Sequence, residues 1–189
     1  MAAVAWDVPT PRAVVLDLTD ATRSAALCFT VGRSGRPVDD RGLPESLVVS
    51  DRLDRSRTLD VLVCGPTAVD AAAAVAAFAA GQARAIVAAD DPEQLVAALA
   101  ALELGLSLVP ADLLERARAV PALTDRQRAV LGGVLAGQSN AEMARALQVR
   151  PVTVKREVAG LFGAFGACRR FELMSVAFGL GFRADALRP

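Results

Sequence analysis

The sequence predicts an N-terminal α/β domain, in which helices flank a parallel sheet, followed by an all-α domain of four helices. Short apolar runs alternate with helical stretches in the first part of the chain, whereas from Leu123 onward apolar residues recur at helical spacing. The charge changes near the same point. Residues 1–120 carry 11 basic and 16 acidic side chains, a net of −5, and residues 121–189 carry 10 and 5, a net of +5. We therefore expect three segments: an α/β domain at 1–110, a linker helix at 111–120 and an all-α domain at 121–189.

The composition excludes several classes of protein. Of the 189 residues, 53% are hydrophobic and 22% are charged, which is typical of a globular chain. The longest uncharged stretches, such as residues 71–83, are too short for a membrane-spanning helix. Asp7 and two prolines interrupt the start before a secretory signal can develop, so we expect the protein in the cytoplasm. The chain contains no histidine, which removes His-based catalysis and most zinc sites.

No enzymatic chemistry is expected. The odd number and wide spacing of the cysteines indicate reduced thiols rather than disulfides or a metal knuckle: Cys28, Cys64 and Cys168. The GRSG run at residues 32–35 matches neither a dinucleotide-binding loop nor a P-loop. Three acids are interpreted as solvated loop residues rather than a paired general acid and base: Asp39, Asp40 and Asp51. We therefore expect no catalytic residues, no cofactor and no metal.

Four apolar runs are the expected strands: 13–18, 46–49, 59–64 and 85–88. The expected helices are 68–80, which is almost entirely alanine, and 92–104, which opens with proline at a helix-start position. This alternation indicates a parallel sheet that is covered on both faces. The segment 30–46 has Gly and Pro at turn positions and no clear period, so we expect a loop there. A short linker helix is expected at 111–118.

The C-terminal region predicts four helices. Thr124 and Gln127 form a capping box for the first helix, which ends at Gly137. Asn140 is expected to cap a second helix that breaks after Val149. The third helix begins at Pro151 and has a buried apolar stripe consisting of Val154, Val158, Leu161, Phe162 and Phe165. That stripe turns four residues outward together: Val152, Lys155, Arg156 and Ala159.

A short helix, a tight connection and a helix with a polar outward stripe form a helix-turn-helix, whose second helix can enter the DNA major groove. The run LTDRQRAVLGGVLAGQSNAEMARALQVRPVTVKREVAGLFGAFG closely resembles the LuxR/GerE-type DNA-binding domain of bacterial transcription factors. Matching positions include Leu123, Thr124, Arg126, Val130, Leu131, Gly137, Ser139, Asn140, Glu142, Ala144, Leu147, Val149, Thr153, Val154 and Lys155. The resemblance implies that residues 152–165 are the recognition helix and that double-stranded DNA is the partner.

By this resemblance, five residues are candidate DNA contacts: Arg150, Thr153, Lys155, Arg156 and Glu157. Lys155 is the only lysine of the chain and stands at the family's lysine position; with Arg156 it would reach bases or phosphates. Glu157 stands where members often carry histidine, and would either accept a hydrogen bond from cytosine N4 or repel phosphate. Arg150 stands in place of the family's usual small cap and adds a candidate phosphate contact. The helix is less basic than is typical, which leaves a second hypothesis: a pseudo-regulator that titrates a partner protein by heterodimerisation.

Residues 83–117 resemble the last strand, last helix and linker of the receiver domain of NarL-like response regulators. This resemblance puts Asp17, Asp51, Cys64 and Ala88 at strand ends, where a receiver has its acid pocket. A receiver needs an acidic pair for Mg²⁺, a phosphoacceptor aspartate, a hydroxyl and a lysine. Here Leu18 stands in place of the second acid, and the thiol and the methyl group replace the hydroxyl and the lysine. We expect a shortened, degenerate receiver-like domain that is controlled independently of aspartyl phosphorylation, through an unknown effector or partner protein.

A homodimer is expected because two recognition helices must lie about one DNA turn apart. The family resemblance implies a dimer contact on the fourth helix, at residues 169–178, through Phe171, Met174 and Phe178. Alternatively, the core of the domain itself takes up all three side chains. The helix at 92–104 is another candidate interface, although packing on its own sheet accounts for Leu95 and Leu99. The leading hypothesis is a sequence-specific DNA-binding transcriptional regulator.

Overall fold

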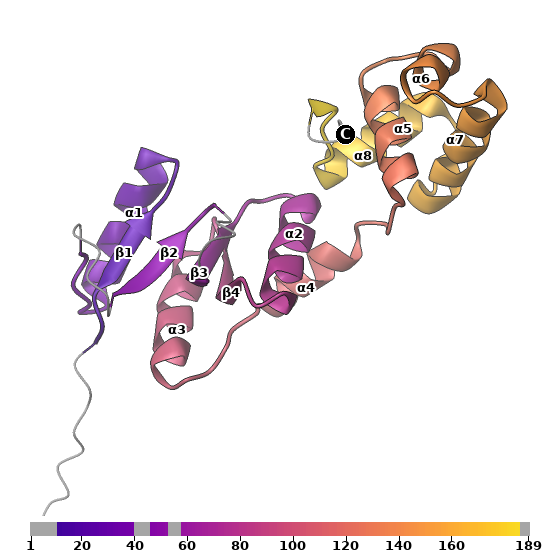
Figure 1. Ribbon diagram of the computed structural model, residues 1–189. Coiled ribbons are helices and arrows are strands. Elements are labelled where there is room, and N and C mark those ends of the chain that lie inside the picture. The colour runs from indigo at the N-terminus through magenta and orange to yellow at the C-terminus, as the bar shows by residue number, and fades with distance from the viewer. Residues whose placement is uncertain (1–10, 40–45, 53–57, 186–189) are drawn as a thin grey trace, which may run out of the picture. The chain divides into compact units, whose positions relative to one another are not determined.

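The computed structural model describes residues 11–39, 46–52 and 58–185. Its elements are β1 (Val14–Asp17), α1 (Ala21–Arg33), β2 (Leu47–Ser50), β3 (Leu59–Cys64), α2 (Ala68–Ala79), β4 (Ala83–Ala88), α3 (Pro92–Glu103), α4 (Ala111–Arg118), α5 (Asp125–Leu135), α6 (Asn140–Ala146), α7 (Pro151–Phe165) and α8 (Arg170–Leu180) (Figure 1). Within the described ranges, no helix is long and apolar enough to cross a membrane.

The chain divides into two compact units. The first consists of Met1–Pro66 with Ala73–Leu114, and the second of Thr67–Ala72 with Glu115–Pro189. The division falls inside α4, which has the bounds expected for the short helix at 111–118 and ends two residues before the limit of 120 given to the linker segment. The limits of the three predicted segments remain a prediction.

A four-stranded parallel sheet in the order β1-β2-β3-β4 forms the centre of the first unit (Figure 1). All four expected strands are present, and β4 begins two residues earlier than predicted, at Ala83. The register pairs Asp17 with Ser50 and Cys64 with Ala88, so the carboxyl ends of the strands lie along one edge. Isolated parallel bridges extend the sheet beyond β1 and β4: Val14 with Val38, and Ala85 with Leu108.

The helix α1 differs from the prediction, which left the segment from Thr30 onward as a loop. Its last turn extends to Arg33. The helix begins at Asp20, whose carboxylate accepts hydrogen bonds from two backbone N–H groups of the first turn, and it buries Leu27 and Val31 on one face. These two buried residues lie one turn apart, while the other large apolar residue of the helix, Phe29, is exposed, so the segment has only a weak helical signal. Within the described residues, the segment between β1 and β2 contains the helix α1 and the residue Val38, which forms an isolated bridge with Val14.

The core of the first unit lies between the sheet and the helices α1 and α3. Alternate strand residues on one face, among them Val61 and Val63, pack with Leu95, Leu99 and Leu102 of α3. Leu95 and Leu99 are fully buried, which confirms that this helix packs on its own sheet. The remaining residues of β3 and β4 are largely buried as well, as expected for parallel strands that are covered on both faces.

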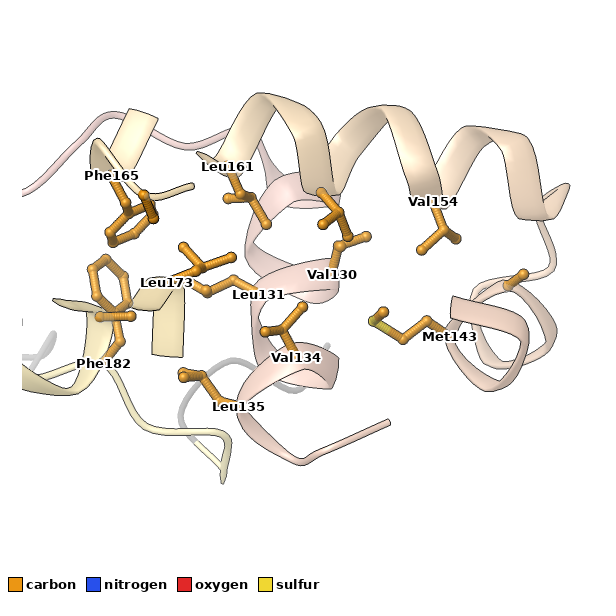
Figure 2. Close-up of a cluster of buried hydrophobic side chains, with 14 residues drawn as sticks. Val130, Leu131, Val134, Leu135, Met143, Val154, Leu161, Phe165, Leu173 and Phe182 are labelled. Carbon is orange, nitrogen blue, oxygen red and sulfur yellow. The ribbon is translucent and has the colours of Figure 1, made fainter. Parts of the chain in front are cut away.

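The second unit contains α5 to α8 around a separate core (Figure 2). Capping boxes begin both α5 and α6. Thr124 pairs with Gln127 as predicted, whereas Ser139 pairs with Glu142 and is the cap of α6. The predicted cap, Asn140, is therefore the first helical residue. The hydroxyl of Ser139, and not the side chain of Asn140, accepts the hydrogen bond from the N3 backbone N–H.

The predicted stripe of α7 forms a large part of this core, and Figure 2 shows it facing α5. Val154, Val158, Leu161 and Phe165 are buried, and Phe162 is partly buried. The helix α6 ends at Ala146, earlier than predicted. The reason is the backbone of Gln148, whose φ of 54° is incompatible with a continuing right-handed helix. A tight connection thus links α6 to α7.

Candidate functional site

The outward face of α7 carries one valine and two cations on its first two turns. Val152 is 67% exposed, Lys155 is exposed, and the side chain of Arg156 is 75% exposed. The three residues share a face because they are spaced by three and four positions. Beyond them, the exposed residues have no side-chain atom beyond the β-carbon: Ala159, Gly160, Gly163 and Ala164. Long side chains on this face are therefore confined to the N-terminal half of the helix.

The other predicted contacts lie at the start and the margin of this face. Arg150 is the N-cap residue and is exposed, but its side chain makes no capping hydrogen bond. Thr153 is partly buried. The side chain of Glu157 is only 15% exposed, and its carboxylate lies 3.5 Å from the Arg156 guanidinium. Four of the five predicted residues thus present a group near the first two turns, whereas most of the Glu157 side chain is covered.

Sequence reasoning missed Arg170, which holds the connection between α5 and α6. Its guanidinium donates hydrogen bonds to the backbone carbonyl of Gln138 and, at 3.5 Å, to Oδ1 of Asn140. This contact ties the beginning of α8 to the beginning of α6, the helix that precedes α7. No local pattern signals it, because the partners lie 30 and 32 positions away in the sequence.

The three predicted residues of α8 have different environments. Phe171 is 81% exposed and Phe178 is 41% exposed, whereas Met174 packs partly against the core. The alternative in which the core takes up all three side chains is therefore wrong. Leu173 and Ala177 are the buried residues of α8, and their position on the helix turns Phe171 away from the core.

The four residues of the predicted receiver-like pocket all lie at the carboxyl edge of the sheet. Asp17, Cys64 and Ala88 are the last residues of β1, β3 and β4, and Asp51 directly follows β2. Adjacent parallel strands bring these ends to the same edge. The four residues thus lie at one edge, as expected, although the receiver resemblance puts Asp51 after the third strand and here it follows the second.

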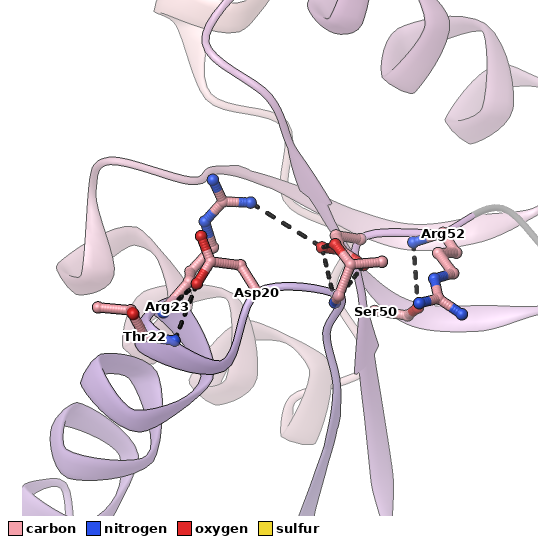
Figure 3. A network of polar contacts seen from close by, with 7 residues as sticks. Asp20, Thr22, Arg23, Ser50 and Arg52 are labelled. Carbon is pink, nitrogen blue, oxygen red and sulfur yellow. Dashed lines mark hydrogen bonds and ion pairs between the residues drawn. The ribbon is translucent and has the colours of Figure 1, made fainter.

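The Asp51 carboxylate is engaged by the connection between β1 and α1. The backbone N–H of Thr19 donates to its two oxygens at 3.0 and 3.1 Å, and the Thr19 hydroxyl donates to one of them. The Arg23 guanidinium lies 3.9 Å away, and the Asp51 side chain is only 7% exposed. Figure 3 shows this network beside the Asp20 cap of α1. Asp51 therefore serves as a structural link between two neighbouring strands, and its interpretation as a solvated loop residue is wrong.

The remaining pocket positions are also engaged within the fold. The backbone N–H of Ala88 donates to Oε1 of Gln94 at 3.1 Å. Cys64 is buried, and its thiol donates to the carbonyl of Gly65 at 3.1 Å. A methyl group and a buried thiol thus lie at the two strand ends where the receiver resemblance would put a lysine and a hydroxyl.

Residues 121–177 match the family model described as bacterial regulatory proteins, luxR family. This segment of the chain is therefore a LuxR-type helix-turn-helix domain, as its motif indicated. No curated protein matches the chain.

Two solved structures of RcsB are similar in fold to most of this chain. One contains two RcsB dimers bound to two parallel DNAs and is 13% identical, covering 91% of this chain and all of that one, with a TM-score of 0.58. The other is the RcsB response regulator of Salmonella typhimurium, which is 15% identical, covers 87% of this chain and 98% of that one, and has a TM-score of 0.57. They confirm a receiver-like α/β domain followed by a helical domain.

A shorter similarity involves VqmA of Vibrio cholerae. It is 32% identical over 33% of this chain, with a TM-score of 0.33. The matched region spans about 28% of the VqmA chain.

Proposed function

We propose that this protein is a cytoplasmic DNA-binding transcriptional regulator that acts as a homodimer and is controlled independently of aspartyl phosphorylation. The observation that carries this proposal is the outward face of α7, where Lys155 and Arg156 project from the second helix of a LuxR-type helix-turn-helix. Arginine and lysine pair with guanine O6 and N7 or hold phosphates, and Arg150 adds a third cation at the helix start. The net charge of +5 over residues 121–189 has the sign that a polyanion requires.

The dimer is supported by the exposed aromatic residues of α8. Phe171 and Phe178 present apolar rings to solvent. A two-fold arrangement that covers them would pair the two α7 helices for successive half-sites on DNA. RcsB, which shares the fold, binds DNA as dimers. Met174, which is partly buried, would contribute the edge of the same surface.

Independence from aspartyl phosphorylation is supported by the engagement of Asp51. Phosphorylation of this carboxylate would disrupt its hydrogen bonds to Thr19, and no lysine stands at the position of Ala88 to neutralise the added charge. The input of the N-terminal domain would then be an effector or a partner protein. Incubation with acetyl phosphate and Mg²⁺ should leave the intact mass unchanged; a stoichiometric, acid-labile gain located at Asp51 would contradict this part of the proposal.

The test of DNA binding is selection of bound duplexes from a random DNA pool by the full-length protein, followed by binding measurements across a salt series. We expect an enriched, roughly palindromic motif and an affinity that falls steeply with salt. The variant Lys155→Ala should reduce the slope of log K against log salt by about one if Lys155 contacts a phosphate. Arg33→Ala, which removes an exposed cation from α1, is the matched control and should leave the slope unchanged.

The second candidate is the pseudo-regulator that titrates a partner by heterodimerisation. It is favoured by the C-terminal half of the outward face of α7, which lacks long side chains, and by Glu157, whose carboxylate lies beside Arg156. This candidate predicts no enriched motif, only weak binding at low salt, and no change of slope in Lys155→Ala. The same selection and salt series therefore separate the two functions.

A further inference from the structure

Val152 is the large hydrophobic residue that α7 leaves exposed. Its exposure of 67% contrasts with the burial of the apolar stripe on the opposite side of the same helix. It follows Pro151 in the first turn, one turn before Lys155 and Arg156, and shares their face. An apolar side chain therefore stands among the groups that are proposed to meet DNA.

The position of Val152 on the helix places it where bases are read. In helix-turn-helix proteins, the N-terminal residues of the recognition helix contact base edges in the major groove. The side chain of valine ends in two methyl groups and can neither donate nor accept a hydrogen bond. The apolar group that a base pair presents in that groove is the C5-methyl group of thymine. Contact with this methyl group is the favourable interaction open to Val152 there.

The rest of the outward face permits a close approach. Gly160 and Gly163 lie beyond Arg156 and add no side chain that would hold the helix away from the groove. A β-carbon built at Gly163 would meet no atom of the protein within 4 Å, so internal packing does not require glycine at this position. Val152 is also stiff, because branching at its β-carbon restricts its rotamers, and a fixed methyl group can discriminate between bases.

We propose that Val152 is a specificity-determining residue that recognises the C5-methyl group of one thymine in each half-site. This assignment rests on the proposed DNA-binding function. It predicts that replacement of that thymine by deoxyuridine, which removes only the methyl group, weakens binding. The expected loss is about fourfold per half-site, the effect of burying roughly one methylene-sized group.

The experiment uses the motif selected by the full-length protein. Each thymine is replaced in turn by deoxyuridine, and the affinities of the native protein, Val152→Ala and Lys155→Ala are measured on every duplex. We expect one thymine per half-site at which the native protein and Lys155→Ala lose about fourfold and Val152→Ala loses less than twofold. Circular dichroism should show the native helix content for Val152→Ala, because the residue is exposed.

Two outcomes overturn the assignment in different ways. If the pool yields no enriched motif, the proposed function fails and the role of Val152 fails with it. If a motif is enriched, but deoxyuridine has no effect at any position or has the same effect in Val152→Ala as in the native protein, only the role of Val152 fails.

Discussion

Charged side chains at the edges of the N-terminal sheet differ in their contacts from those on the outward face of α7. At both edges of the N-terminal sheet, charged groups are bound within the fold. Asp51 accepts hydrogen bonds from Thr19, and Glu103 forms a bidentate ion pair with the buried Arg36. On α7, by contrast, Lys155 makes no hydrogen bond or ion pair within the described part of the chain, and Arg156 has a single long contact to Glu157. The first set stabilises the unit that carries it, whereas the second remains available for a partner.

This difference shows that the same arrangement of strand ends can carry side chains that are bound within the fold. The carboxyl edge of the sheet brings together the strand ends at which the resemblance puts a receiver pocket, but Asp51, Cys64 and Ala88 are each bound by other groups of the fold. Residues 121–177, which match the luxR family model, present Lys155 and Arg156 as exposed cations on α7. A similar fold therefore indicates where a site would lie. Whether the side chains there can bind a ligand or partner depends on whether contacts within the fold already occupy them.

Loss of Glu103 should have the largest effect on stability. Its carboxylate binds Arg36 and also accepts a hydrogen bond from the backbone N–H of Arg12 at 3.1 Å. Glu103→Gln leaves the buried Arg36 without its counter-charge. We expect a loss of about 2 kcal/mol in the free energy of unfolding at pH 7, less than for a fully buried pair because part of the Glu103 side chain remains exposed.

The same pair predicts how this loss depends on pH. The hydrogen bond from Arg36 is the main factor that lowers the pKa of Glu103 below its usual value of 4.5. A carboxyl group with a lowered pKa in the folded state stabilises the fold above its unfolded pKa, and this contribution disappears as the pH falls through the folded pKa. The difference between native protein and Glu103→Gln should therefore shrink below about pH 4.5 in urea titrations. A difference that stays constant from pH 7 to pH 3 would contradict this account.

Asp51→Ala should have the next largest effect. It removes the acceptor for the Thr19 backbone N–H and hydroxyl, and we expect the N-terminal unit to lose about 1.5 kcal/mol. Hydrogen exchange should show faster exchange at the start of α1 and the end of β2, with no change in α5 to α8. Asp51→Asn is the matched control, because it keeps one acceptor oxygen and should lose less. Equal stability in all three proteins would mean that the carboxylate is not a structural link.

Sequence patterns predicted the elements whose signal is local. The bounds of β3 were predicted to the residue, and α7 begins at the predicted proline, because continuous apolar runs, helical spacing and Pro151 act over a few positions. The helix α1 was missed because its buried face consists mainly of Leu27 and Val31. Periodicity is weak when two apolar residues must define a helix.

The parts of the site that depend on distant partners could not be predicted. Nothing near Asp51 in the sequence indicates that Thr19, 32 positions earlier, will bind it. Arg170 gave no signal for the same reason. For α8, apolar residues occur on more than one face, so the pattern alone did not decide that Leu173 would be buried and Phe171 exposed.

Gly163→Ala should change the free energy of unfolding least, and should raise it rather than lower it. It tests whether the outward face of α7 is free of internal contacts, unlike the edges of the sheet. Glycine in a helix interior costs about 1 kcal/mol relative to alanine. A β-carbon at Gly163 meets no protein atom within 4 Å, so alanine should stabilise the C-terminal unit by up to that amount, about 1 kcal/mol. Thermal unfolding would measure the gain. Gly133→Ala is the contrasting control. Its β-carbon would lie 2.6 Å from two side-chain atoms of Met143, so this substitution should destabilise the unit.

The same variant also tests the approach to DNA. Because a β-carbon at Gly163 meets no protein atom within 4 Å, any loss of DNA affinity in the more stable Gly163→Ala would show that the glycine serves the approach to DNA. A loss of stability in Gly163→Ala would instead mean that this face of α7 packs within the fold. The contrast between α7 and the edges of the sheet would then be wrong.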